Sequence, residues 1–170
     1  KRHLAQALQF TLPGAPNVYY GAELGQAGGG DPANRGPMRW DLVSDANPEL
    51  AWMRRLVGLR QQHRALRVGD YRAVESQRLF AFERHTDRTL DTRIVVVNPG
   101  TQTVREKIMV ANAHLMPETP MVDVLGMVPN AAPVGFGPGF ITVELPPQGV
   151  LVLQPQPKAL GGYSRYKRVP

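Results

Sequence analysis

Several side chains that could do chemistry lie in one long segment, from Gly21 to Ser44. The segment mixes Asp, Asn, Arg and Trp side chains with glycine and proline breakers, which is typical of a loop. A loop of this length inside a compact domain is usually functional or disordered, and low-complexity linkers rarely carry a tryptophan such as Trp40. We therefore predict that this loop takes part in the function of the protein.

Composition and spacing argue against several other chemistries. The chain has no cysteine, which excludes disulfides, cysteine-based zinc sites and a thiol nucleophile. The four histidines lack the spacing of a metal-binding pair; they are His3, His63, His85 and His114. Asp87, Asp91 and Asp123 form no calcium-binding loop. The glycines of residues 25–30 are not followed by the Gly-Lys-Ser/Thr of a phosphate-binding loop. We expect no metal and no cofactor.

The net charge of +6 is concentrated towards the end of the sequence. Residues 155–170 contain no acidic side chain and four basic ones, which are Lys158, Arg165, Lys167 and Arg168. This distribution indicates a basic tail rather than a nucleic-acid-binding face, so we expect no nucleic-acid partner. No apolar run approaches the length of a membrane span, and we expect no membrane partner. We expect a soluble protein; its compartment stays open, with the cytoplasm favoured.

Two helices and one strand are expected to position the long loop. Apolar residues at helical spacing predict a helix over residues 1–12, which Pro13-Gly14 ends. The β-prone run Asn17–Tyr20 predicts a short strand directly before the loop. After the loop, Asn47 as N-cap and Pro48 at the first helical position begin a second helix, which extends to about residues 63–66.

From Gly69 onwards the pattern changes to short strands at regular spacing, which is typical of an antiparallel sandwich. The expected strands are Tyr71–Val74, Arg78–Glu83, Arg93–Asn98, Val104–Met109, Met121–Val124, Phe140–Glu144 and Val150–Gln154. The chain is thus predicted to divide into residues 1–68, a β-sandwich domain over residues 69–155, and a basic tail over residues 156–170.

The predicted first part is incomplete as a fold. A single strand between two helices has no sheet to join, and its backbone polar groups need partners. Helix–strand–helix order fits one sector of a larger parallel α/β assembly. We therefore expect polypeptide outside this chain to supply the rest of the sheet, and the absence of an initiator Met at Lys1 agrees with this.

Two sequence stretches resemble the α-amylase superfamily, glycoside hydrolase family thirteen. Residues 11–25, TLPGAPNVYYGAELG, are similar to the family pattern T-x-P-G-x-P-x-x-Y-Y-G-[DE]-E-x-G at the last barrel strand. Residues 29–41, GGDPANRGPMRWD, look like the family's following loop. The run Asn47–Leu50 and the residues after it resemble its last barrel helix. The resemblance implies an α/β plus all-β protein: the final helix–strand–helix sector of a (β/α)₈ TIM barrel, followed by an antiparallel β-sandwich.

The resemblance also implies roles for four residues. Asp31 and Arg35 match a clamp for sugar hydroxyls, although they could instead pair with each other and brace the loop. Tyr20 and Glu23 would line the barrel mouth. Alternatively they pack at the end of the strand, with Glu23 bound to a backbone group or an arginine; packing is favoured for Tyr20, and both readings stay open for Glu23. Ala22 stands where the family usually has an acidic residue. Trp40 could stack on a sugar, but anchoring of the loop is favoured. No residue of this chain matches a family catalytic carboxylate.

The function implied by the resemblance is that of a retaining glycoside hydrolase acting on α-glucosidic bonds of starch-derived oligosaccharides, similar to cyclomaltodextrinases, neopullulanases and α-glucosidases. This chain would contribute substrate positioning and barrel stability, with an α-glucan and the missing barrel polypeptide as partners. Two alternatives stay open: a non-catalytic β-sandwich that binds or scaffolds, and a nucleic-acid binder whose affinity falls steeply with salt.

Overall fold

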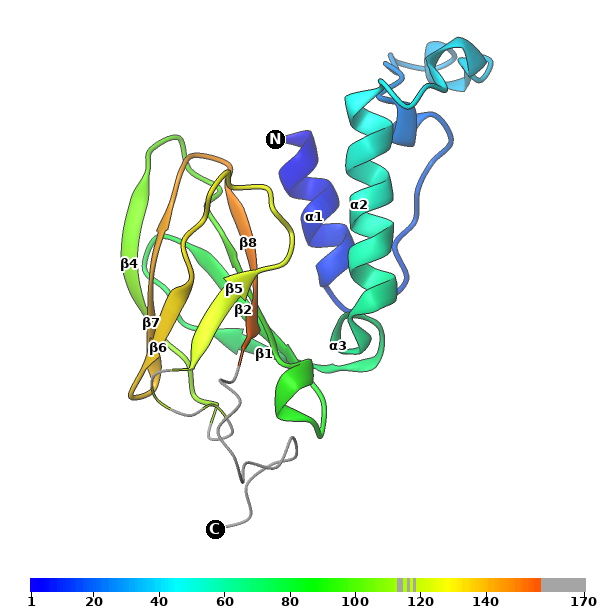
Figure 1. The fold of residues 1–170 in the computed structure, drawn as a ribbon. Helices are drawn as coiled ribbons and strands as arrows, with labels where there is room; N and C mark the ends of the chain where they lie inside the picture. Colours follow the sequence, from blue (N-terminus) through cyan, green and yellow to red (C-terminus); the bar gives the residue numbers. More distant parts are fainter. Residues whose placement is uncertain (113–114, 116, 118, 157–170) are drawn as a thin grey trace.

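The computed structural model describes residues 1–112, 115, 117 and 119–156. Helical segments fill the first part of the chain and strands fill the rest (Figure 1). Three α-helices are present in the described residues: α1 Arg2–Thr11, α2 Pro48–Gln62 and α3 Arg64–Val68. Short 3-10 helices are η1 Ala22–Leu24, η2 Ala33–Arg35, η3 Trp40–Leu42 and η4 Thr89–Asp91. The predicted basic tail, apart from Gln156, and His114 lie outside the described residues.

Helix α2 confirms the sequence prediction, including its N-cap. The Oδ1 atom of Asn47 accepts from the backbone N–H of Glu49 at 2.9 Å, and Pro48 occupies the first turn. One face of α2 is buried, through Trp52, Met53, Leu56 and Leu59. A break at His63 separates α2 from the short helix α3, which the sequence did not reveal.

Helix α1 ends beside two arginines from elsewhere in the fold. Its last turn contains no basic residue of its own. Arg60 of α2 donates to the Phe10 carbonyl at 2.8 Å, and Arg84 of the sheet donates to the Thr11 carbonyl at 2.7 Å. These guanidinium groups satisfy carbonyls that a helix C-terminus leaves unpaired and complement its partial negative charge. These contacts join residues that lie 50 and 73 positions apart in the sequence.

The strand expected at Asn17–Tyr20 is not formed. Described residues 15–19 carry no regular secondary structure, and Tyr20 begins a turn. A β-strand needs a neighbouring strand for its backbone N–H and C=O groups, and no other strand runs beside this segment within the described residues. Residues 17–20 have the composition of a β-strand, but no described strand lies beside them to accept and donate the backbone hydrogen bonds.

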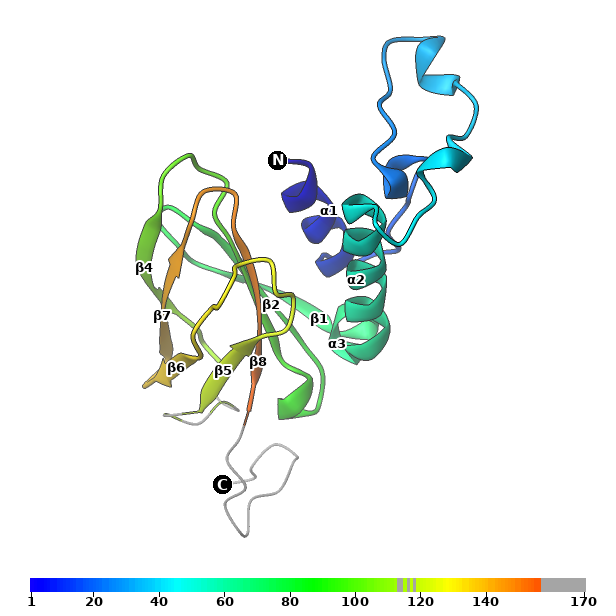
Figure 2. The same cartoon turned by 45° about the horizontal axis from the view of Figure 1, so that its top comes forward.

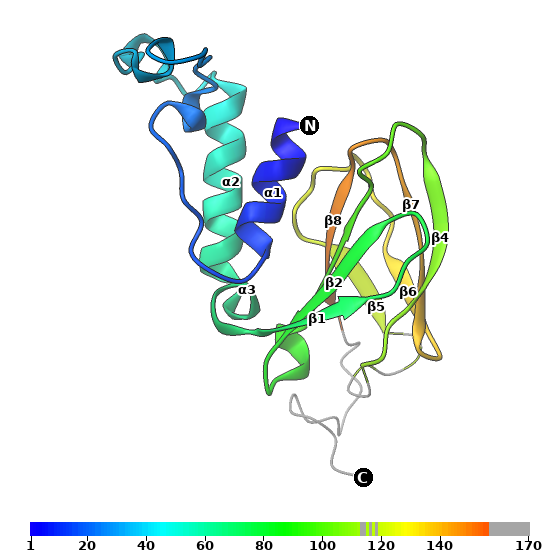
Figure 3. The same cartoon turned by 180° about the vertical axis from the view of Figure 1, so that it is seen from behind.

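The eight strands form one continuous antiparallel sheet in the order β1-β2-β3-β8-β5-β6-β7-β4. Their bounds are β1 Asp70–Val74, β2 Phe80–His85, β3 Arg93–Val97, β4 Val104–Met109, β5 Pro120–Asp123, β6 Val134–Gly137, β7 Phe140–Leu145 and β8 Val150–Pro155. The sheet curls until β4 and β7 lie across from its other end (Figures 1 and 3). The antiparallel prediction is confirmed. The expected two-sheet sandwich is replaced by one curled sheet, because the unexpected strand β6 pairs with both β5 and β7.

The central strands β3 and β8 separate two hydrophobic cores. Ile94 and Val96 of β3 face the core inside the curled sheet, whereas Val95 and Val97 face the helices. Strand β8 alternates in the same way, as expected from the two-residue period of a strand. The second core joins α1, α2 and α3 to the outer face of the sheet. The division into domains at residue 68 stays a prediction, since this core spans the proposed boundary.

No helix in the described part of the chain has the length and apolar character needed to cross a membrane.

Candidate functional site

The long loop projects beyond the N-terminal end of α2, on the side of the helices away from the sheet (Figures 1 and 2). Two side-chain amides hold it together. Gln26 donates to the Pro37 carbonyl at 3.0 Å and accepts from the Arg39 N–H at 3.2 Å. Asn47 donates to the carbonyls of Leu24, at 3.1 Å, and Leu42, at 2.9 Å. The loop is therefore cross-linked between its early and late residues.

Gly21 makes the first of these clamps possible. Its φ of +84° lies in the left-handed region, which disfavours side chains. A Cβ atom at this position would also lie 2.6 Å from Oε1 of Gln26, the oxygen that accepts from Arg39. The glycine thus provides both the turn after Tyr20 and the space for the Gln26 side chain.

Asp31 and Arg35 are brought together at the far part of the loop. Arg35 Nε lies 3.0 Å from Asp31 Oδ1, and its Nη2 lies 3.4 Å from Oδ2, so the contact is two-pronged. Arg35 ends the short helix η2, and Asp31 lies four residues before it, just ahead of the residue that caps this helix. Their side chains are 62% and 72% exposed, respectively, so both groups are open to solvent as well as to each other. The mutual pairing considered from the sequence is present in the structure.

Tyr20 and Glu23 lie at the base of the loop. The Tyr20 hydroxyl donates to the Gly36 carbonyl at 3.0 Å, and its ring lies against Tyr19, with 4.6 Å between centroids. Glu23 sits in η1. Its Oε2 atom is buried and has no hydrogen-bond partner among the described residues. A buried carboxylate oxygen without a partner is uncommon, because burying it unpaired is costly.

The anchoring of the loop to a barrel by Trp40 stays a prediction, because the described residues contain no barrel against which it could pack. Trp40 is 74% exposed, and no other aromatic ring contacts it within the described residues. Its neighbours Arg39 and Asp41 form an ion pair, with Arg39 Nε 2.7 Å from Asp41 Oδ1. The Gln26 clamp and the Arg39–Asp41 pair were both missed from the sequence. Gln26 near the start of the loop and Asn47 just after its end are amide side chains, and their positions could have indicated these hydrogen bonds across the loop.

A glycosidase acid requires a raised pKa, whereas four of the described carboxyl groups have a lowered pKa. Hydrogen bonds from Arg39 lower the pKa of Asp41, and hydrogen bonds from Arg64 lower that of Asp87. At Glu49 and Glu106 burial raises the pKa, but hydrogen bonds outweigh it and the net shift is also downward. The described residues also contain no group of three or more His, Asp or Glu side chains that could hold a metal ion.

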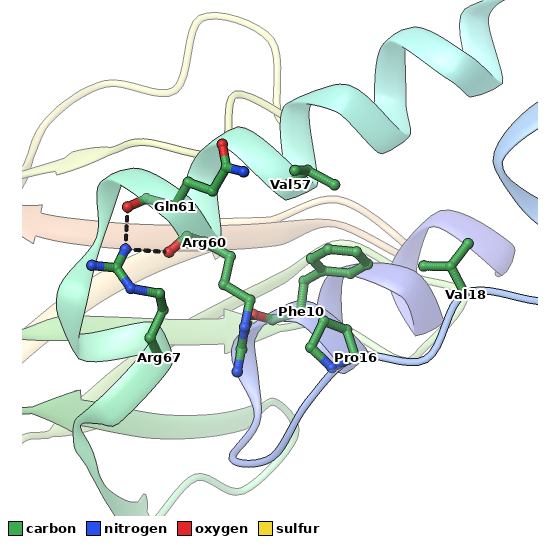
Figure 4. Close-up of a pocket in the computed structure, with 7 residues that line it drawn as sticks. All are labelled: Phe10, Pro16, Val18, Val57, Arg60, Gln61 and Arg67. Carbon is green, nitrogen blue, oxygen red and sulfur yellow. Dashed lines mark hydrogen bonds between the residues drawn. The ribbon is translucent and has the colours of Figure 1, made fainter.

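A shallow groove of about 310 Å³ lies between the end of α1, the segment after it and α2 (Figure 4). Its lining is mostly apolar and consists of Phe10, Pro16, Val18, Val57, Arg60, Gln61 and Arg67. It contains none of the four predicted substrate-binding residues and no carboxylate. The groove is therefore no candidate for acid–base chemistry.

Comparison with known proteins supplies the family. A cyclomaltodextrinase from a Bacillus species is 40% identical over 101 residues, which are 58% of this chain and 18% of that protein. The fold matches the α-amylase of Geobacillus thermoleovorans, solved in complex with acarbose, with a TM-score of 0.74 and 25% identity. That match covers 93% of this chain and 33% of the α-amylase. The proteins that this chain resembles are α-amylase family glycoside hydrolases.

The similarity covers only part of each of those proteins. The chain corresponds to a C-terminal part of α-amylase family proteins and spans less than a fifth of the length of the cyclomaltodextrinase. The amino acid transporter heavy chain SLC3A2 of Oryctolagus cuniculus is also similar, 33% identical over 126 residues that cover 62% of this chain and 24% of that protein. No protein-family model matches the chain.

Proposed function

We propose that this chain is part of a retaining glycoside hydrolase that acts on α-glucosidic bonds of starch-derived oligosaccharides. The similarity to a cyclomaltodextrinase and to an α-amylase solved with acarbose supports this substrate class. Within that enzyme the chain contributes substrate positioning and barrel stability. The carboxylates that break the bond come from polypeptide outside this chain.

The helical part would complete a (β/α)₈ barrel. Residues 17–20 have the composition of a strand but no neighbouring strand in the described residues, so a parallel sheet from the rest of the protein could pair with them. The apolar groove beside Pro16 and Val18 offers further surface for that polypeptide. In such barrels the loops that follow the strands build the active site, which places the loop of residues 21–44 at its mouth.

The exposed Asp31–Arg35 pair is the observation that carries the proposal. A carboxylate accepts hydrogen bonds from adjacent sugar hydroxyls, and a guanidinium donates in a fixed fork. Each group holds the other through the 3.0 Å and 3.4 Å contacts, so both are oriented before substrate arrives. Such contacts place the sugar for reaction at the catalytic carboxylates and do not themselves break the bond.

Tyr20 and Glu23 would support this subsite from below. The Tyr20 hydroxyl binds the Gly36 carbonyl, directly after η2, and so fixes the segment that carries Arg35. The unpartnered Oε2 atom of Glu23 is an acceptor for a donor that the described residues do not provide. A substrate hydroxyl or a side chain of the missing polypeptide would satisfy it.

In the full-length enzyme, Arg35→Ala is expected to raise KM for maltotriose by about tenfold, equivalent to about 1.4 kcal/mol, with a smaller change in kcat. The guanidinium positions substrate, so its loss weakens binding more than chemistry. Arg54→Ala is the matched control, because Arg54 forms a similar exposed pair with Asp45 at 2.7 Å but lies on α2. Equal kinetics for Arg35→Ala and wild type would remove Arg35 from the substrate site.

The isolated 170-residue chain is expected to show no hydrolysis of maltooligosaccharides, since a retaining glycosidase needs two carboxyl groups about 5–5.5 Å apart, one of them with a raised pKa. Reducing-end assays on chromatographically pure chain would measure this. Turnover that co-purifies with the chain would show that it carries its own catalytic pair.

The second candidate function is a non-catalytic binding or scaffolding module. The similarity to the SLC3A2 heavy chain, which is named for transport rather than hydrolysis, favours it. The coding sequence upstream of this chain distinguishes the hydrolase from the non-catalytic module. Strand-borne Asp and Glu motifs upstream support the hydrolase, whereas an upstream barrel without them supports the module.

A further inference from the structure

The backbone around Trp40 is held in place, whereas its ring is exposed among the residues that the structure describes. Before Trp40, the Arg39 N–H donates to Gln26 Oε1 at 3.2 Å. After it, the Leu42 carbonyl accepts from Asn47 Nδ2 at 2.9 Å. Helix η3 adds a bond from the Val43 N–H to the Trp40 carbonyl at 3.1 Å. Trp40 is 74% exposed, and hydrogen bonds hold its backbone on both sides. Its indole ring is therefore positioned in advance for contact with a ligand.

Polar groups accompany the indole on both sides in sequence. Arg39 and Asp41 are both exposed and pair through Arg39 Nε and Asp41 Oδ1 at 2.7 Å. An aromatic face provides a large apolar contact, and the guanidinium and carboxylate provide donors and acceptors near it. A glucosyl ring has the complementary chemistry, with C–H groups on its faces and hydroxyls around its edge. An apolar peptide would leave this ion pair without a role.

We propose that Trp40, with Arg39 and Asp41, forms an additional glucosyl-binding subsite on the loop, separate from the Asp31–Arg35 pair. The inference rests on the proposed α-glucan function and extends it to glucan length. Helix η2, which contains Arg35, and helix η3, which contains Trp40 and Asp41, occupy different places along the loop (Figure 2). A longer glucan can contact both, whereas a short one uses the Asp31–Arg35 pair. Trp40 thereby gives the enzyme a preference for longer chains.

The test compares substrates of two lengths with the full-length enzyme. Trp40→Ala is expected to raise KM for maltoheptaose about tenfold, the equivalent of about 1.4 kcal/mol, and to raise KM for maltotriose less. Trp40→Phe, which keeps an aromatic face, should restore most of the preference. Val43→Ala is the matched control, because Val43 is an exposed apolar residue at the end of the same helix, 51% exposed and without a role in the proposal.

A measurement without turnover tests the same contact. The difference in acrylamide quenching between wild type and Trp40→Phe isolates the fluorescence of Trp40. Maltoheptaose is expected to protect that signal, and maltotriose to protect it less. Lack of protection, or equal KM changes for the two substrates together with a lower Tm in Trp40→Ala, would overturn the subsite and assign Trp40 to packing. A wild-type enzyme that binds maltoheptaose at Trp40 but hydrolyses no glucan would instead refute the hydrolase and leave the subsite standing.

Discussion

Leu56→Ala is expected to lower the free energy of unfolding by about 3–5 kcal/mol, the range for deleting a fully buried leucine side chain. Leu56 is completely buried in the core that α1, α2 and α3 share with the outer face of the sheet. Its neighbours in this core come from both parts of the chain, including Phe10 of α1 and Phe82 of β2. A cavity there weakens the helices and the sheet together.

Urea denaturation followed by circular dichroism would measure this effect. The helical signal at 222 nm and the near-ultraviolet signal should move to lower urea together, as a single transition. Val57→Ala is the control, since Val57 is the next residue on α2 but is 38% exposed and lies outside this core. It should change the free energy of unfolding by less than about 1 kcal/mol. A Leu56→Ala variant as stable as Val57→Ala would show that the helices do not share a core with the sheet.

Acidification from pH 7 to about pH 4.5 is expected to cost about 2–3 kcal/mol of stability through one histidine, His63. Burial, together with the positive charges of Arg93 and Arg67, lowers its pKa from 6.5 to about 4, against a smaller opposing effect of Asp91. Nδ1 of His63 lies 2.8 Å from Nη2 of Arg93, so the neutral ring accepts this hydrogen bond. A protonated ring would lose the bond and face a like charge.

Stability falls with pH because the unfolded chain binds a proton at His63 at a higher pH than the folded chain does. Between pH 6.5 and pH 4 the unfolded chain takes up a proton at His63 and the folded chain does not, so the free energy of unfolding falls as the pH falls. The carboxyl groups with lowered pKa, among them Glu49 and Asp87, lose their contribution only below about pH 4.5. The window from pH 6.5 to 4.5 therefore lies above the range in which these carboxyl groups lose their contribution, and a variant of His63 is needed to assign the slope to its imidazole.

His63→Gln keeps an acceptor for Arg93 but cannot titrate, and it should flatten the stability profile in this window. His3→Gln is the comparison for the substitution itself, because His3 also makes one side-chain hydrogen bond, to Glu49 at 2.9 Å. The slope of His63→Gln should be the flatter of the two. Urea unfolding at half-unit pH steps measures all three proteins. An unchanged slope in His63→Gln would mean that the imidazole is not the titrating group.

Much of the local structure was predictable because short-range chemistry determines it. Asn47-Pro48 specifies the start of α2 through a side-chain cap and a ring that suits the first turn. The run Ile94–Val97 indicated a strand buried on both faces, and each face of β3 does contact a separate core. The residues that carry the family resemblance, such as the Asp31-Pro32 and Tyr19-Tyr20-Gly21 pairs, are likewise local patterns.

The sequence by itself determined the helices that flank the loop, the antiparallel strands and the presence of Asp31 and Arg35 four residues apart in the loop. Only the tertiary structure decided that the strands make one curled sheet, that Arg84 and Arg60 close α1, and that Trp40 is exposed. It also decided that residues 17–20 form no strand. The reason is physical: a cap or a buried stripe depends on neighbours a few residues away, whereas a ladder, a core or a bridging arginine depends on groups that only folding brings together.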